Sequence, residues 1–342
     1  MPPPYMLLLF VPAVFVFLLE PRLVPPRTLP AIPDADEAED LALFRRAVLL
    51  SSSSSSAHRQ TKQKVAFLFL TNSGLAFAPL WEKYFAGNHG LLNIYVHADP
   101  STPLSLPPSA RSFHGRVVRG TKATQRASAT LISAARRLIA AALLDDPANR
   151  FFALLSQSCV PLRPFPALHR ALAADPNHRS FIEVLGAAPT LRDRYSARGD
   201  GAMVPEVPFE SFRVGSQFFV LARRHAVAVV GDRRLWGKFR LPCLVERQRS
   251  CYPEEHYFPT LLDMLDPAGC AGFSLTSVNW TGSFDGHPRT YRAEEVSADL
   301  IRDLRKPPSN GTYSHSHMFA RKFAPGCLAP LMEIADSVIL RD

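Results

Sequence analysis

Two neighbouring carboxylates in residues 251–262 (CYPEEHYFPTLL) are the side chains best suited by type to acid–base chemistry. Glu254 or Glu255 could take a proton from an attacking hydroxyl if it faced a cleft. Adjacent residues of an α-helix point about 100° apart, so we expect only one of the two to face a given pocket. The alternative interpretation is structural, because Pro253 and the acids after it suit the first turn of a helix.

A basic segment near the C-terminal end, residues 317–323 (HMFARKF), could balance negative charge on a ligand. Lys322, together with Arg321, has the charge needed to hold a diphosphate. Arg302 and Arg305 lie upstream and add positive charge to this part of the chain. The alternative is a strand edge whose charged side chains are solvated.

A bound metal finds no support in the sequence. In transferases that use nucleotide sugars, an Asp-x-Asp pair after a strand ordinarily holds a divalent cation. The one such triplet here, Asp34-Ala-Asp36, follows Pro33 in an acidic stretch with no strand before it. Asp99 follows an apolar run but has no second Asp two residues away. We therefore expect no metal and no other cofactor, and assign the neutralisation of charge to Lys and Arg.

Other kinds of site are disfavoured. The sequence has no G-x-S-x-G, P-loop or G-x-G-x-x-G motif, and Ser158 and Cys159 lack the glycines that would expose a nucleophile. The five cysteines include no C-x-x-C pair, which disfavours a zinc site. They allow up to two disulfides, with buried thiols as the alternative. The Lys and Arg residues that give the net charge of +9 are scattered along the sequence, so we expect no nucleic-acid partner.

Short apolar runs alternate with helical patterns along most of the chain. We expect strands at residues 64–70, 91–97, 150–156, 180–184 and 215–222, and helices at 79–85, 126–144, 165–174 and from residue 224. This alternation predicts an α/β fold with a mostly parallel sheet covered on both faces. Ligands of such sheets bind at the carboxyl ends of the strands, so Thr71, His97 and Asp99 are candidates for nucleotide binding.

The N-terminal region predicts attachment to a membrane. Residues 5–19 are uncharged, and we interpret residues 1–20 as a signal-anchor transmembrane segment, with a cleaved signal peptide as the alternative. Arg22 and Arg27 follow the apolar run and argue weakly against a luminal C-terminus. Residues 21–62 are rich in Pro, Ser and acids and predict a flexible stem, with a short helix around residues 40–50. The sequons at Asn279 and Asn310 favour a luminal domain over residues 63–342.

Seven segments, taken in order, resemble one family. They are residues 67–71 with 80–82, then 94–97, 150–162, 181–183, 215–218, 251–256 and 319–323. The chain resembles the plant branch of the Core-2/I-branching enzymes, the β-1,6-N-acetylglucosaminyltransferases of glycosyltransferase family 14. The resemblance covers about residues 64 to 335.

The resemblance implies a single-pass type II Golgi membrane protein with a luminal, GT-A-like Rossmann domain. It implies inverting, metal-independent transfer from a UDP-sugar to a glycan hydroxyl, with Glu255 as the catalytic base and Glu254 in place of a family Asp. Lys322 corresponds to the family's Lys that stands in for the metal, and Arg302 or Arg305 to its Arg. Glu183 falls where animal members place an acidic contact to the acceptor.

The chain also departs from the plant pattern. Residues 122–127 (KATQRA) lack a usual Trp-Gly, Ala134 and Ala135 replace an Ala-Glu, and Phe212 stands where a Trp is common. These departures leave a divergent specificity open, and donors of the N-acetylglucosamine, xylose and glucuronic acid classes all fit. The rival functions are a non-catalytic membrane protein that keeps the transferase fold, and a glycoside hydrolase with two carboxylates ~5–9.5 Å apart.

Overall fold

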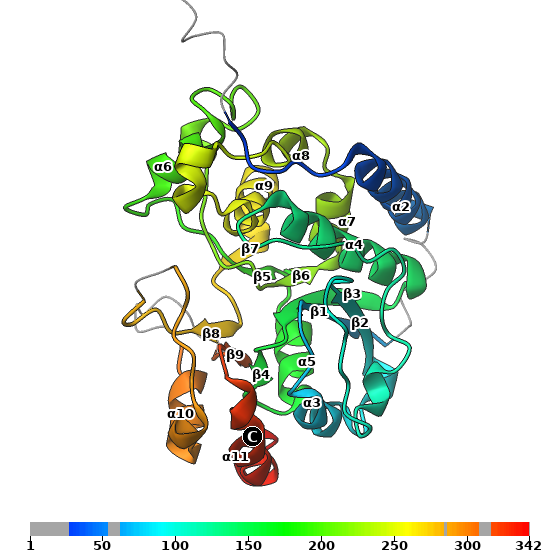
Figure 1. Cartoon of the computed structure of the whole chain (residues 1–342). Helices are drawn as coiled ribbons and strands as arrows, with labels where there is room; N and C mark the ends of the chain where they lie inside the picture. Colours follow the sequence, from blue (N-terminus) through cyan, green and yellow to red (C-terminus); the bar gives the residue numbers. More distant parts are fainter. Residues whose placement is uncertain (1–26, 54–61, 284–285, 308–315, 342) are drawn as a thin grey trace, which may run out of the picture.

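The structure is a computed structural model that describes residues 27–53, 62–283, 286–307 and 316–341. A six-stranded sheet lies at its centre (Figure 1). Its strands, in spatial order, are β2 (Leu92–Ala98), β1 (Lys64–Thr71), β3 (Asn149–Ser156), β6 (Val220–Ala222), β5 (Ser180–Glu183) and β7 (Cys270–Gly272). Only β6 among these six runs antiparallel to its neighbours. The prediction of an α/β fold with a mostly parallel sheet is confirmed.

Alternation along β1 explains why both faces of the sheet are covered. Val65, Phe67 and Phe69 pack into one apolar core with helices α3 (Ala78–Phe85) and α5 (Phe165–Ala174). Ala66 and Leu68 point the other way. They pack into a second core with the helices on that face, which are α2 (Asp34–Ser53), α4 (Ala129–Asp145), α7 (Arg223–Gly231), α8 (Arg234–Phe239) and α9 (Tyr257–Leu265).

A second, three-stranded sheet carries the basic segment. Its strands, in spatial order, are β4 (Val160–Pro161), β9 (Phe319–Arg321) and β8 (Thr276–Val278). Helices α10 (Ala298–Arg305) and α11 (Leu328–Glu333) lie beside it, and the short helix α6 (Leu191–Tyr195) lies across the molecule from them (Figure 1). Because β4 directly follows β3 in the chain, the small sheet is held next to the carboxyl end of the large one.

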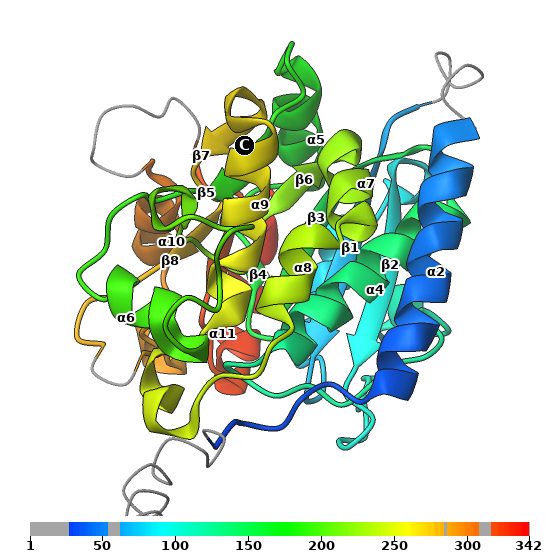
Figure 2. The ribbon, with the colours of Figure 1, turned by 90° about the horizontal axis from the view of Figure 1, so that it is seen from above.

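Helix α2 differs from the expected flexible stem. Residues 34–53 form one helix that lies along α4 and α7 (Figure 2), whereas we expected helix only around residues 40–50 of the stem. Phe44 and Ala47 are buried in the core on this face of the sheet. Asp40 forms a buried ion pair with Arg137 of α4, with 2.7 Å between its Oδ2 and the guanidinium Nη2. The acidic composition that suggested a solvated tether is therefore matched by charges from the folded domain.

Two element boundaries also differ from expectation. The strand expected at 215–222 is limited to Val220–Ala222, because Gly215 turns away and donates its N–H to the carbonyl of Glu255 at 2.9 Å. The helix expected at 126–144 begins at Ala129 instead. Ser128 ends the preceding loop and caps this helix, since its hydroxyl accepts the N–H of Thr130.

No helix in the described part of the chain is long and apolar enough to cross a membrane. The anchor predicted at residues 1–20 and the sequon at Asn310 both lie outside the described residues. The cysteine pairing that the sequence left open is resolved in part: Cys243 and Cys251 form a disulfide. The other three cysteines, Cys159, Cys270 and Cys327, are thiols.

Candidate active site

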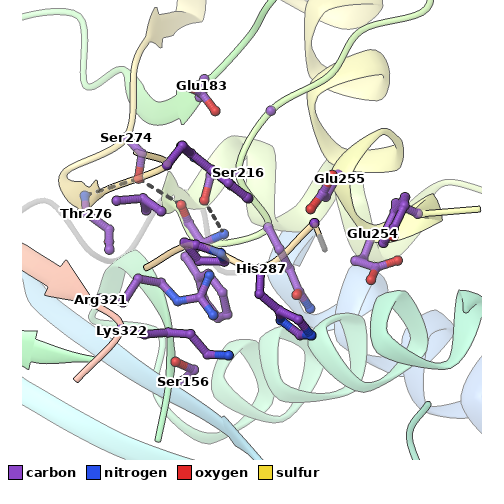
Figure 3. Close-up of a pocket in the computed structure, with 18 of the residues that line it drawn as sticks. Ser156, Glu183, Ser216, Glu254, Glu255, Ser274, Thr276, His287, Arg321 and Lys322 are labelled. Carbon is purple, nitrogen blue, oxygen red and sulfur yellow. Dashed lines mark hydrogen bonds between the residues drawn. The ribbon is translucent and has the colours of Figure 1, made fainter. Parts of the chain in front are cut away.

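A cavity of about 950 Å³ lies where the large sheet meets the small one. Residues at the carboxyl ends of β1, β3 and β5 line one side of it, and residues of β8 and the end of β9 line the other. Parallel α/β sheets bind ligands at this end of their strands. Figure 3 shows acidic, basic and hydroxyl side chains that line this cavity.

Both neighbouring glutamates line the cavity. They lie on a 3-10 turn, η7 (Pro253–Glu255), and not on the α-helix that we expected, since α9 begins only at Tyr257. The separation of about 100° expected for neighbours on an α-helix therefore does not apply to this pair. The disulfide of Cys251, two residues before Pro253, ties this turn to the segment around Cys243.

Glu255 is held in place by an arginine that sequence reasoning missed. The guanidinium Nη1 of Arg194 lies 2.6 Å from the Glu255 carboxylate Oε2. Arg194 belongs to α6 and also lies over the ring of Tyr252, with its guanidinium carbon 4.8 Å from the ring centroid. All three side chains line the cavity. Arg194 is 61 residues from Glu255 in sequence, and no motif links the two.

Glu254 lies deeper in the wall. Its Oε1 accepts the backbone N–H of Ala127 at 3.0 Å, and its Oε2 is buried with no hydrogen-bond partner in the described structure. Burial in a poorly hydrated site raises the pKa of Glu254 to about 8, and the nearby charge of Glu255 acts in the same direction. At neutral pH this side chain is therefore a protonated acid beside the carboxylate of Glu255.

Glu183, at the end of β5, is the third carboxyl group of the cavity. Burial raises its pKa, and Glu255 adds to that effect. The chain passes close by at Gly215: a Cβ there would lie 2.0 Å from the carbonyl oxygen of Glu183. Glycine at this position is thus what allows the loop before β6 to approach β5 and hold Glu183 and Glu255 near each other.

His256 and Phe212 support the turn that carries the glutamates. The two rings stack, with centroids 4.4 Å apart, and the ring nitrogen Nδ1 of His256 donates to the carbonyl of Arg213 at 2.7 Å. Burial lowers the pKa of His256 to about 3, so the ring is neutral. Phe212, which replaces a common Trp, is therefore a packing residue behind the site.

Arg321 and Lys322, at the end of β9, line the same cavity. Figure 3 shows both side chains entering it on the side away from Glu254. The Arg321 guanidinium carbon lies 4.3 Å from the centroid of the Phe218 ring, and burial lowers the pKa of this arginine. Arg321 and Lys322 thus place positive charge on the side of the cavity away from Glu254, which suits a ligand with an anionic group at one end.

Other predicted site residues do not reach the cavity. Arg302 is exposed and pairs with Asp299 at 2.6 Å. Arg305 donates to the carbonyls of Leu162 at 2.7 Å and Val338 at 2.6 Å, which attaches α10 to the two segments of this chain that contain these residues. Neither side chain lines the cavity, so the mechanism proposed below does not assign the diphosphate to them.

Of the predicted nucleotide contacts, only Thr71 lines the cavity, where its hydroxyl donates to the carbonyl of Ser73 at 2.6 Å. His97 is buried behind the wall, with its Nε2 3.0 Å from Arg137 Nη1. Asp99 accepts the backbone N–H and the hydroxyl of Thr124 at 2.6 Å and 2.7 Å. His97 and Asp99 therefore contact the loop that contains Lys122 and Thr124, and neither lines the cavity.

Two further predictions concern glycans and metals. Asn279 is half-buried beside Trp280, which lines the cavity, and glycosylation at Asn279 stays a prediction. Among the described residues, no three His, Cys, Asp or Glu side chains form a group that could hold a metal ion.

The fold and the site agree with comparisons to known proteins. Residues 65–305, more than two thirds of the chain, match the model of the Core-2/I-Branching enzyme family, and the chain belongs to that family. It is also similar to the rice (Oryza sativa subsp. japonica) protein glycosyltransferase BC10. The two are 28% identical over 314 residues, which cover 80% of this chain and 76% of the rice protein. The chain is therefore a glycosyltransferase, as its sequence predicted.

Proposed function

We propose that this enzyme transfers a sugar from a UDP-sugar to a glycan hydroxyl, with inversion and without a metal. The observation that carries the proposal is that Glu255 and the cations Arg321 and Lys322 line one cavity. The parallel strands β2, β1 and β3, with the cavity at the carboxyl ends of β1 and β3, support a GT-A-like Rossmann arrangement. Donors of the N-acetylglucosamine, xylose and glucuronic acid classes remain the candidates.

In the proposed reaction, Glu255 takes the proton of the acceptor hydroxyl as that oxygen attacks the anomeric carbon. The bond from this carbon to the diphosphate oxygen breaks on the opposite side, so UDP leaves and the configuration inverts. Arg194 supports this role, because its ion pair with Glu255 fixes the carboxylate at the cavity wall. A positioned base typically contributes ~10²–10⁴-fold to the rate.

Negative charge develops on the departing diphosphate, and the proposal assigns its stabilisation to Arg321 and Lys322. Fixed cations in a site shielded from water stabilise such charge more than solvent does. Arg321 suits this task because it is half-buried and its guanidinium lies over the ring of Phe218. The two residues lie beyond the part of the chain that the family match covers.

The proposed location is the Golgi membrane, with residues 1–20 as a type II anchor and the described domain in the lumen. The uncharged run at residues 5–19 and the sequons at Asn279 and Asn310 support this proposal. The disulfide between Cys243 and Cys251 supports it as well, since disulfides persist in secretory compartments.

The test is a donor panel. The purified protein is incubated with UDP-linked N-acetylglucosamine, xylose and glucuronic acid, each with and without EDTA, and release of UDP is measured. We expect one donor to be turned over at the same rate in both conditions. Loss of that turnover with EDTA would contradict the metal-independent mechanism, and glycan cleavage without any donor would indicate a hydrolase.

A further inference from the structure

One loop of the cavity is connected to helix α2, which lies outside the family match. This loop comprises residues 122–127 and is called the cavity loop below. Thr124 and Arg126 from it line the cavity, and Ala127 donates its N–H to Glu254. The position of this loop therefore affects both the shape of the cavity and the turn that carries Glu254 and Glu255.

The first residue of the cavity loop, Lys122, is clamped by the acidic face of α2. Its Nζ lies 2.9 Å from Glu39 Oε2 and 3.2 Å from Asp36 Oδ1, and it donates to the carbonyl of Asp36 at 2.8 Å. Asp40, one turn on, places Oδ1 3.9 Å from the same Nζ. Residues three and four apart share a face of a helix, so these acids form one anionic patch around a single ammonium group.

The rest of the cavity loop is fixed by other elements of the domain. Asp99 at the end of β2 holds Thr124, and Thr130 of α4 accepts the N–H of Gln125 at 2.8 Å. The guanidinium of Arg126 donates to the carbonyl of Gly286 at 2.9 Å. Lys122 is thus the point at which α2 holds a loop whose other residues contact the domain or the cavity.

We infer that α2 belongs to the catalytic unit and that Lys122 is a positioning residue, which holds the cavity loop through its ion pairs with Asp36 and Glu39. The ammonium group is mostly shielded, because the Lys122 side chain is 14% exposed. The two acids are more open to solvent, with exposed fractions of 39% for Asp36 and 73% for Glu39, so solvent screens these two pairs in part. The consequence for turnover rests on the proposed function, whereas the consequence for the loop's order does not.

Charge reversal at Lys122 tests whether its ion pairs with Asp36 and Glu39, called the clamp below, hold the cavity loop. In Lys122→Glu, repulsion from Asp36 and Glu39 releases the cavity loop, and amide hydrogen exchange measured by mass spectrometry should rise at residues 122–127. The value of kcat/KM for the donor found in the panel should fall about 10- to 100-fold, because small displacements of positioned groups have effects of this size. Adding Glu39→Lys to Lys122→Glu should restore part of the protection of residues 122–127 from exchange and part of the lost kcat/KM.

Two further variants complete the test. Arg46→Glu reverses a charge on an exposed position of α2 and should leave exchange and kcat/KM unchanged. If Lys122→Glu fails to fold, Asp36→Asn combined with Glu39→Gln removes the clamp more gently and should show the same pattern. Wild-type exchange in the cavity loop, or faster exchange with unchanged kcat/KM, would overturn the inference. An inactive wild-type protein would overturn the proposed function, and loop exchange would still decide whether the clamp exists.

Discussion

At the scale of single residues, two adjacent glutamates have different environments. Glu255 pairs with Arg194 at 2.6 Å, whereas Glu254 is buried with one carboxyl oxygen unpartnered in the described structure. The difference in solvation explains why one serves as the proposed base and the other carries a proton at neutral pH. Type and spacing alone could nominate both residues but could not separate their roles.

The buried acid predicts how stability depends on pH. The pKa of Glu254 rises from its ordinary value of 4.5 to about 8 on folding. Between these values the unfolded chain has lost the proton and the folded protein keeps it, so stability falls as pH rises through this window. Glu254→Gln cannot titrate, and it should gain stability relative to wild type from about pH 5 to about pH 8, by on the order of a few kcal/mol.

Urea unfolding at the two pH values measures this gain. Glu246→Gln, at an exposed position, is the control and should follow the pH dependence of wild type. The account of Glu254 fails if Glu254→Gln and wild type lose stability in parallel across the window.

At the scale of elements, α2 is joined to the sheet layer by a buried charge pair. Both side chains are nearly inaccessible, with exposed fractions of 4% for Arg137 and 7% for Asp40. Arg137 also contacts His97, so the pair connects α2 to the end of β2. A buried ion pair as a whole contributes little to the free energy of unfolding, but removing one partner leaves the charge of the other buried and uncompensated.

Asp40→Asn should therefore destabilise the protein by about 3 kcal/mol, the low end for a broken buried pair. Chemical unfolding gives the free energy. The matched control is Asp34→Asn in the first turn of the same helix, because the Asp34 side chain is fully exposed and its nearest guanidinium nitrogen lies 4.0 Å away. Equal effects of the two substitutions would show that the Asp40 pair does not hold α2.

The elements that could be predicted from sequence are those with strong local patterns. Strands β1 and β3 are apolar runs, and α5 begins with Phe165 and Pro166, so their bounds matched expectation closely. Three acids of α2, which are Asp36, Glu39 and Asp40, instead find their partners Lys122 and Arg137 82 to 97 positions away. Glu37 pairs with Arg240, further still along the chain. The composition of residues 34–53 gives no information about partners so far away in the sequence, which is why α2 was expected within a flexible stem.

At the scale of the whole molecule, the cavity is assembled from segments far apart in the chain. Strand ends of the large sheet, the turn η7 and the end of β9 meet around it (Figure 3). Sequence motifs nominated Glu254, Glu255, Arg321 and Lys322, which meet there, and also Arg302 and Arg305, which do not. The sequence shows the basic residues near the C-terminus, but tertiary packing decides which of their side chains line the cavity.

The central claim is that Glu255 removes the acceptor's proton across the cavity from Arg321 and Lys322. The most direct measurement compares kcat of Glu255→Gln with wild type, while calorimetry with UDP and the unfolding midpoint verify that the site and fold remain. We predict a loss of ~10²–10⁴-fold in kcat with UDP affinity retained, and no loss for the exposed control Glu246→Gln. Turnover like that of wild type in Glu255→Gln would contradict the account.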